Sequence, residues 1–78
     1  MTRGPARMPL TPRQAQVLTA AADGAPLREV ANRLDVTRET VAARLSDAYR
    51  RLDVTHLPRG DRRQAAVRTA RARGLITP

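Results

Sequence analysis

Residues 26–52, PLREVANRLDVTRETVAARLSDAYRRL, decide the fold of this chain. Apolar side chains recur at three- and four-residue spacing on both sides of a short break at 35–37, which predicts an amphipathic helix over about 26–34 and a longer one over about 38–52. Thr37 stands where its hydroxyl can accept a hydrogen bond from a free amide of the second helix. In a basic chain, this pattern indicates a DNA-reading helix-turn-helix whose second helix enters the major groove.

Composition narrows the class of protein. The chain has 78 residues and a formal net charge of +8, with 15 basic residues, all of them arginine, against 7 acidic ones. Such an excess suits a polyanionic partner. Phe, Trp and Cys are absent and Tyr49 is the only aromatic residue, so a core of Leu, Val, Ile and Ala in packed helices is expected. Without cysteine and with only His56, we expect no metal site, no cofactor and no enzymatic activity.

The N-terminal residues and the distribution of apolar residues indicate where in the cell the protein is expected. No apolar run approaches the ~20 residues that a membrane span requires, and residues 1–9 lack the apolar core of a signal peptide. The simplest expectation is a cytoplasmic protein that does not enter a membrane. Residues 1–9 also have too little apolar content to fold alone, which predicts a flexible basic N-terminal arm followed by one DNA-binding domain over 10–78.

A helix is expected before the central stretch. Thr11 can act as its N-cap, Pro12 fits the first helical position, and Gln14 completes a capping box. Gly24 can adopt the left-handed conformation that ends a helix. These residues predict a first helix from Pro12 to near Gly24.

A last helix is expected after a loop. A loop is predicted over 53–60, because the segment ends in Pro58, Arg59 and Gly60, and proline and glycine interrupt regular secondary structure. Asp61 can then cap a helix that runs to about Gly74, followed by an apolar lid of Leu75 and Ile76. The chain is therefore predicted to be all-α, with four helices. Leu57, within the loop, either closes over the core or is exposed for a partner.

The helix at 38–52 has an inward and an outward face when it is unrolled at about 100° per residue. Small side chains at the middle of the outward face allow the helix to approach base edges closely, and arginines at its edges can hold phosphates. A plain solvated face is the alternative. The residues predicted to contact bases are Arg38, Ala42, Ala43 and Ser46, and those predicted to contact phosphates are Thr37, Thr40, Arg50, Arg51 and Arg59.

The last helix carries a candidate dimer surface. Ala65, Thr69 and Ala72 recur at four- and three-residue spacing and are expected to form a narrow outward ridge, with Arg68 among the arginines beside it. Two such ridges can pack closely across a two-fold axis. An ordinary exposed face is the alternative, because alanine is simply a good helix former. The arginines of two copies repel, which favours a homodimer that forms on DNA.

Several short motifs occur in an order that resembles the LuxR-type (GerE-like) helix-turn-helix family. They are LTPR at 10–13, EVANRL at 29–34, TRETV at 37–41, AV at 66–67 and RGLI at 73–76. The resemblance covers nearly the whole chain after residue 9. It implies a four-helix DNA-binding domain, a role in transcription regulation, recognition of DNA by the third helix, and commonly dimerisation through the fourth.

The chain departs from that family pattern at several positions. Ala42 stands where a basic residue is usual, Arg44 where histidine is usual, and Asp53 where glycine is usual. The loop before the last helix is also longer than the family norm. The replacements at 42, 44 and 53 predict a different base readout, and the longer loop bears on where the dimer helix lies. Only nine residues precede Leu10, whereas many members carry a receiver or ligand-sensing domain there, so either a stand-alone regulator or a fragment is expected.

Three functions remain open from the sequence. The preferred one is a sequence-specific transcriptional regulator that binds double-stranded DNA as a dimer, with its third helix in the major groove. The alternative is a protein-interaction module that heterodimerises with a larger LuxR-type regulator or contacts RNA polymerase. RNA binding ranks last, because the chain lacks the aromatic platforms on which single-stranded bases stack.

Overall fold

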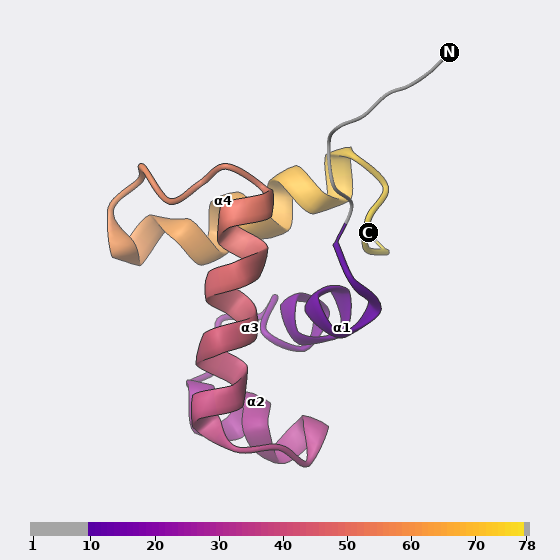
Figure 1. The fold of residues 1–78 in the computed structure, drawn as a ribbon, viewed down its shortest axis with the longest axis vertical. Helices are drawn as coiled ribbons and strands as arrows, with labels where there is room; N and C mark the ends of the chain where they lie inside the picture. The colour runs from indigo at the N-terminus through magenta and orange to yellow at the C-terminus, as the bar shows by residue number, and fades with distance from the viewer. Residues whose placement is uncertain (1–9, 78) are drawn as a thin grey trace.

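The computed structural model describes residues 10–77, which form a bundle around one long central helix (Figure 1). α2 lies at the N-terminal end of α3, α4 crosses the other end, and α1 packs beside them (Figure 1). No strand occurs within residues 10–77, so the predicted all-α, four-helix fold is confirmed. The arm predicted at 1–9 lies outside the described residues. The helices are α1 (Pro12–Ala20), α2 (Leu27–Leu34), α3 (Arg38–Arg51) and α4 (Arg59–Ala72).

The start of α1 has the predicted capping box. The Thr11 hydroxyl accepts a hydrogen bond from the Gln14 amide at 3.1 Å, and the Gln14 side chain accepts one from the Thr11 amide at 3.1 Å. Two of the free amides at this terminus are thereby satisfied. The helix ends at Ala20, earlier than expected, and a turn leads to Gly24, whose φ of +84° is in the left-handed region.

The helix-turn-helix forms where it was predicted. α2 begins after Pro26, which provides no side-chain cap, as its lack of a polar side chain implies. Asp35 ends α2 in the left-handed conformation with φ of +57°, which turns the chain within three residues into α3. Thr37 caps α3 as predicted, since its side chain accepts a hydrogen bond from the Thr40 amide.

The predicted start of α4 was wrong. The helix begins at Arg59, so the loop after α3 ends at residue 58 rather than at residue 60, and Asp61 lies inside the first turn. Pro58 is the N-cap: its extended backbone directs its carbonyl at the helix, where it accepts a hydrogen bond from the Asp61 amide at 2.9 Å. A carboxylate in the first turn still stabilises the helix terminus through the helix dipole. The helix ends at Ala72, shortly before Gly74.

One apolar core joins the helices, and α3 runs through its middle. The loop and the C-terminal segment close this core: Leu57 is half-buried and packs against it, and Ile76 is 8% exposed beneath the half-buried Leu75. The loop residue Leu57 therefore covers the core, which decides a point that the sequence left open. The most buried apolar side chains contributed by the helices include Val17, Leu18, Val30, Val41, Leu45, Ala66 and Ala70.

Candidate nucleic-acid interface

The N-terminus of α3 is held by two of the predicted phosphate ligands. The hydroxyls of Thr37 and Thr40 lie 2.9 Å apart and share a hydrogen bond, while Thr37 also accepts from the Thr40 amide at 3.1 Å. Thr37 is exposed and Thr40 is half-buried. This arrangement fixes the first turn of α3, and its remaining free amides point outward as they do at anion-binding helix termini.

The four residues predicted to contact bases lie together on the exposed side of α3. Arg38, Ala42, Ala43 and Ser46 are all exposed, whereas Val41, Leu45 and Ala48 face the core. Ala42 and Ser46 are one turn apart, so they form a stripe along the helix. The middle of this face is therefore flat, bearing methyl groups and one hydroxyl, and a helix with such a face can lie close to base edges.

Near the C-terminal end of α3, Arg50 already has partners within the chain. Arg50 forms an ion pair with Asp47, and its Nη1 donates a hydrogen bond to the Ser46 hydroxyl at 3.4 Å. These side chains are largely exposed, so the ion pair contributes little to stability and can be exchanged for a phosphate. Arg51 is half-buried beside it. Arg59, the last predicted phosphate ligand, lies at the start of α4 rather than in a loop.

The predicted dimer surface is only partly exposed. Arg68 and Ala72 are exposed and Thr69 is half-buried, but Ala65 is 8% exposed and belongs to the core, so its assignment to an outward ridge was wrong. α4 packs on both α1 and α3, and the arc that it buries, from Ala65 through Ala66 to Val67, covers about 200°. This is wider than the apolar stripe of a helix that packs on one neighbour.

Two arginines have structural contacts that sequence patterns did not reveal. Nη1 of Arg63, on α4, donates to the carbonyl oxygens of Ala25 at 2.6 Å and Ala21 at 3.3 Å, which ties α4 to the turn between α1 and α2. Arg33, on α2, donates to the Ala20 carbonyl at 2.8 Å, at the end of α1. Helical periodicity does not predict contacts across such long sequence separations. The only available signal was a turn rich in carbonyls that lack helical partners.

Arg33 also organises the acidic groups near that turn. It forms ion pairs with Asp23 at 3.0 Å and with Glu29 at 2.9 Å. The Arg33 guanidinium lowers the pKa of the Asp23 carboxyl below its ordinary value, and a hydrogen bond from the Ala25 amide acts in the same direction. Asp23 is therefore charged and paired at neutral pH.

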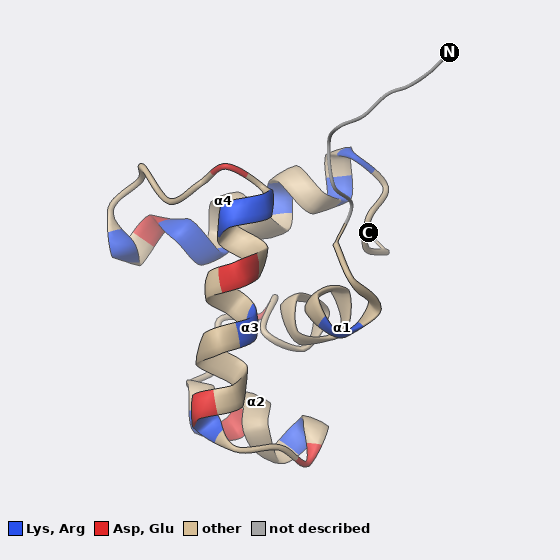
Figure 2. Cartoon of the chain, in the orientation of Figure 1, with Lys and Arg blue, Asp and Glu red and all other residues tan. Residues whose placement is uncertain are grey.

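Arginine dominates the surface over α3 and α4. It recurs along α4 and lies at both ends of α3, where Glu39 and Asp47 are the acidic residues (Figure 2). Glu39 is in the first turn of α3, where the helix dipole favours a carboxylate, and Asp47 is paired with Arg50. Within residues 10–77, no group of three or more acidic, His or Cys side chains is placed to hold a metal ion. None of the helices described has both the length and the apolar content needed to cross a membrane.

The fold and this surface define a small helix-turn-helix domain with a basic, open third helix. The family profile described as "Bacterial regulatory proteins, luxR family" (GerE) matches residues 8–68, and the chain belongs to this family, which confirms the resemblance seen in its motifs. This is a family of DNA-binding regulatory domains and not a family of enzymes.

One relative among curated proteins is the "Response regulator RamR" of Streptomyces coelicolor. It is 47% identical to this chain over 47 residues, which cover 60% of this chain and 23% of that regulator. The similarity thus concerns less than a quarter of the relative's length. No solved structure matches the chain at a significant level.

Proposed function

We propose that this protein is a sequence-specific transcriptional regulator that inserts α3 into the major groove of duplex DNA. The observation that carries the proposal is the flat, exposed centre of α3, formed by Ala42, Ala43 and Ser46 in a domain of the luxR family. Methyl groups can contact thymine, and a hydroxyl can bond to either a base or a phosphate. Arg38, one turn before Ala42, can reach a guanine edge.

Contacts to phosphates flank this reading face. Thr37 and Thr40 share a hydrogen bond that uses the proton of one hydroxyl, so the other hydroxyl keeps its proton to donate to a phosphate. At the other end of α3, Arg50 would exchange Asp47 for a phosphate, while Arg51 and Arg59 extend the basic edge. These contacts set the position of the helix and carry no sequence information themselves.

We further propose that the active form is a homodimer that pairs through α4. The exposed Ala72 and the half-buried Thr69 leave a small surface on α4, with Arg68 beside it, and Ala65 takes no part because it is buried in the core. The arginines of α4 disfavour pairing of free copies, so dimerisation on DNA follows. A symmetric pair would read two half-sites related by a two-fold axis.

The test of this function is selection of binding sites from fragmented genomic DNA by the purified protein. We expect enrichment of fragments that share a short inverted repeat. The affinity for an enriched duplex should exceed that for random duplex by a factor within the ~10³ to 10⁷ range of specific binders, at matched salt. Equal affinity for enriched and random duplexes would contradict sequence-specific binding.

A second candidate function, contact with another protein, is favoured by an apolar hollow. A cavity of about 440 Å³ lies between α1, the end of α2 and the C-terminal segment, and it is lined by Ala15, Ala20, Leu34 and Ile76 among others. Such surfaces are suited to protein contacts. A partner here would be RNA polymerase or a larger regulator of the same family. Co-purification of either with the wild type, and its loss with Ala15→Glu, would support this role.

A further inference from the structure

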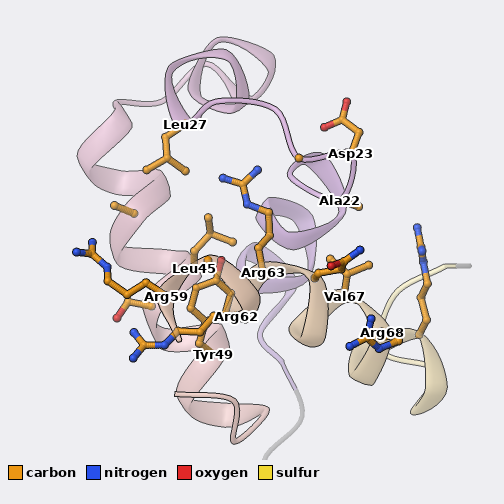
Figure 3. Close-up of a pocket in the computed structure, with 16 residues that line it drawn as sticks. Ala22, Asp23, Leu27, Leu45, Tyr49, Arg59, Arg62, Arg63, Val67 and Arg68 are labelled. Atoms are coloured by element: carbon orange, nitrogen blue, oxygen red, sulfur yellow. The ribbon is translucent and has the colours of Figure 1, made fainter. Parts of the chain in front are cut away.

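A groove between α3 and α4 lies directly beside the exposed face of α3. Its volume is about 850 Å³, and its lining includes the buried Leu45 and Val67 and the half-buried Tyr49 (Figure 3). Ala42 and Ser46 line it on the α3 side. The groove therefore shares residues with the surface proposed to meet base edges.

Arginine lines the α4 side of this groove. The five arginines are Arg59, Arg62, Arg63, Arg68 and Arg71, and the one acidic residue in the lining is Asp23. That carboxylate is already paired with Arg33 at 3.0 Å, so it does not neutralise the arginines of the groove. The groove is consequently a strongly cationic site.

Two of these arginines are held by hydrogen bonds to backbone carbonyls, and the other three are not. Arg62 donates from Nε to the Leu57 carbonyl at 2.8 Å, and Arg63 donates to the carbonyls of the α1–α2 turn, so both side chains are held in place beside Tyr49 (Figure 3). Each guanidinium has five N–H donors, and these contacts use only part of them. Within residues 10–77, the side chains with no hydrogen bond or ion pair in this set are Arg59, Arg68 and Arg71.

Their spacing suits an extended anion. Arg59 and Arg71 are exposed near the two ends of α4, and the half-buried Arg63 and the buried Val67 lie between them at four-residue intervals, on a stripe that turns by about 120° around the helix. At about 1.5 Å per residue, the stripe from Arg59 to Arg71 is about 18 Å long. A single small anion would engage only one end of this length, whereas a polymer with regularly spaced charges can reach the exposed arginines at both ends.

We propose that this groove holds the phosphodiester backbone of one DNA strand, and this inference rests on the proposed function. Because Ala42 and Ser46 belong both to the proposed reading face and to the lining of this groove, a strand that borders the major groove beside them would enter the space between α3 and α4. α4 then acts as a second wall, and its arginines neutralise successive phosphates of that strand. Arg68 belongs to this DNA-binding wall in addition to lying beside the proposed dimer surface.

The test compares two double variants of equal charge. Arg59→Gln with Arg71→Gln removes two groove arginines, while Arg13→Gln with Arg73→Gln removes two exposed arginines that do not line the groove. Loss of two phosphate contacts should reduce the slope of log affinity against log salt by about 1.8. The ratio of the wild-type affinity to the affinity of the groove variant should therefore fall about twelvefold between about 50 and 200 mM salt. The control pair should keep the wild-type slope. Circular dichroism checks that both variants fold.

The possible results separate this inference from the proposed function. If the wild type binds duplex DNA and both double variants have the same slope, the groove does not hold the backbone; the inference and the phosphate contact proposed for Arg59 are then overturned, while the proposed reading of DNA by α3 stands. If the wild type binds no duplex DNA, the proposed function and the inference both fail.

A second measurement identifies the phosphates themselves. Single methylphosphonate groups, which lack the negative charge, are placed in turn along each strand of the bound duplex. Consecutive positions on one strand should weaken binding of the wild type, and the positions that meet Arg59 and Arg71 should have no effect on the Arg59→Gln, Arg71→Gln variant, because that variant lacks those two contacts. A groove variant that loses affinity at the same positions as the wild type would contradict the assignment.

Discussion

Ala43 presents only a methyl group at the centre of the exposed face of α3. In Ala43→Leu, the longer side chain should hold the helix away from base edges while helix formation is preserved, because leucine is also a good helix former. We expect a loss of about 1 to 3 kcal/mol in discrimination between target and random duplex, with salt-dependent binding to random duplex nearly unchanged. Competition binding at fixed salt measures this difference.

The control for this substitution is Ala72→Leu, which adds the same bulk at an exposed position on α4. It should leave discrimination at a single half-site intact. Unchanged discrimination in Ala43→Leu would show that this part of α3 does not meet the bases.

The ion pair between Asp23 and Arg33 makes the stability of the fold depend on pH in the acid range. Arg33 lowers its pKa in the folded state, so the unfolded chain binds the proton more tightly. The ion pair therefore stabilises the fold fully above the ordinary aspartate pKa of about 3.9, and its contribution is lost as the pH falls below that value. Asp23→Asn should reduce the decline in unfolding midpoint between pH 5 and 3, by a small and salt-sensitive amount because both partners are largely exposed.

Urea unfolding as a function of pH measures this contribution. Asp53→Asn is the matched control, since Asp53 is exposed and makes no ion pair within residues 10–77. It should keep the wild-type pH profile. A profile of Asp23→Asn that coincides with the wild type would show that the pair with Arg33 does not form in solution.

At the scale of the element, the start of α3 depends on one hydroxyl. Thr37→Ala removes the acceptor for the Thr40 amide and should lower the free energy of unfolding by about 1 kcal/mol. Thr37→Ser retains the hydroxyl and should keep most of the stability. Urea denaturation of both variants checks the effect, and equal losses in the two would mean that the methyl group rather than the cap is responsible.

The boundaries of the helices show which signals are local. The starts of α1 and α3 could be predicted because Thr11 and Thr37 cap them through contacts only three residues away. The start of α4 could not, because Asp61 has the composition of a cap, whereas the helix begins two residues earlier, after Pro58, without a side-chain cap. Both α2 and α4 follow a proline that provides no side-chain cap, but only in α4 does a nearby Asp offer a misleading cap.

In the candidate site too, features that depend on local sequence could be predicted and features that depend on long-range packing could not. The exposed positions of Ala42, Ala43 and Ser46 follow from helical periodicity alone, and they were predicted correctly. Ala65 is buried, and Arg63 makes its contacts, because α4 packs against segments far earlier in the chain. Arg63 and Ala25, for example, are 38 residues apart. Periodicity within one helix carries no information about such packing.

At the scale of the whole molecule, the proposed homodimer depends on the remaining small surface of α4. Thr69→Glu would place two negative charges across the two-fold axis and remove close contact. Cooperative occupation of two half-sites should be lost, while binding to a single half-site should persist with similar affinity. Titration of duplexes carrying one or two half-sites measures both quantities, and unchanged cooperativity would place the dimer contact elsewhere, with the loop at 53–58 as the next candidate.

In the proposed complex, α3 reads duplex DNA from the major groove. Methylation interference on a selected duplex tests it most directly, because methylation of guanine N7 blocks the major groove and methylation of adenine N3 blocks the minor groove. We predict that N7 methylation prevents binding at guanines within both half-sites, about one helical turn apart, and that the effect is lost in Ala43→Leu. Interference confined to adenine N3, or N7 interference that is the same in Ala43→Leu, would contradict the claim.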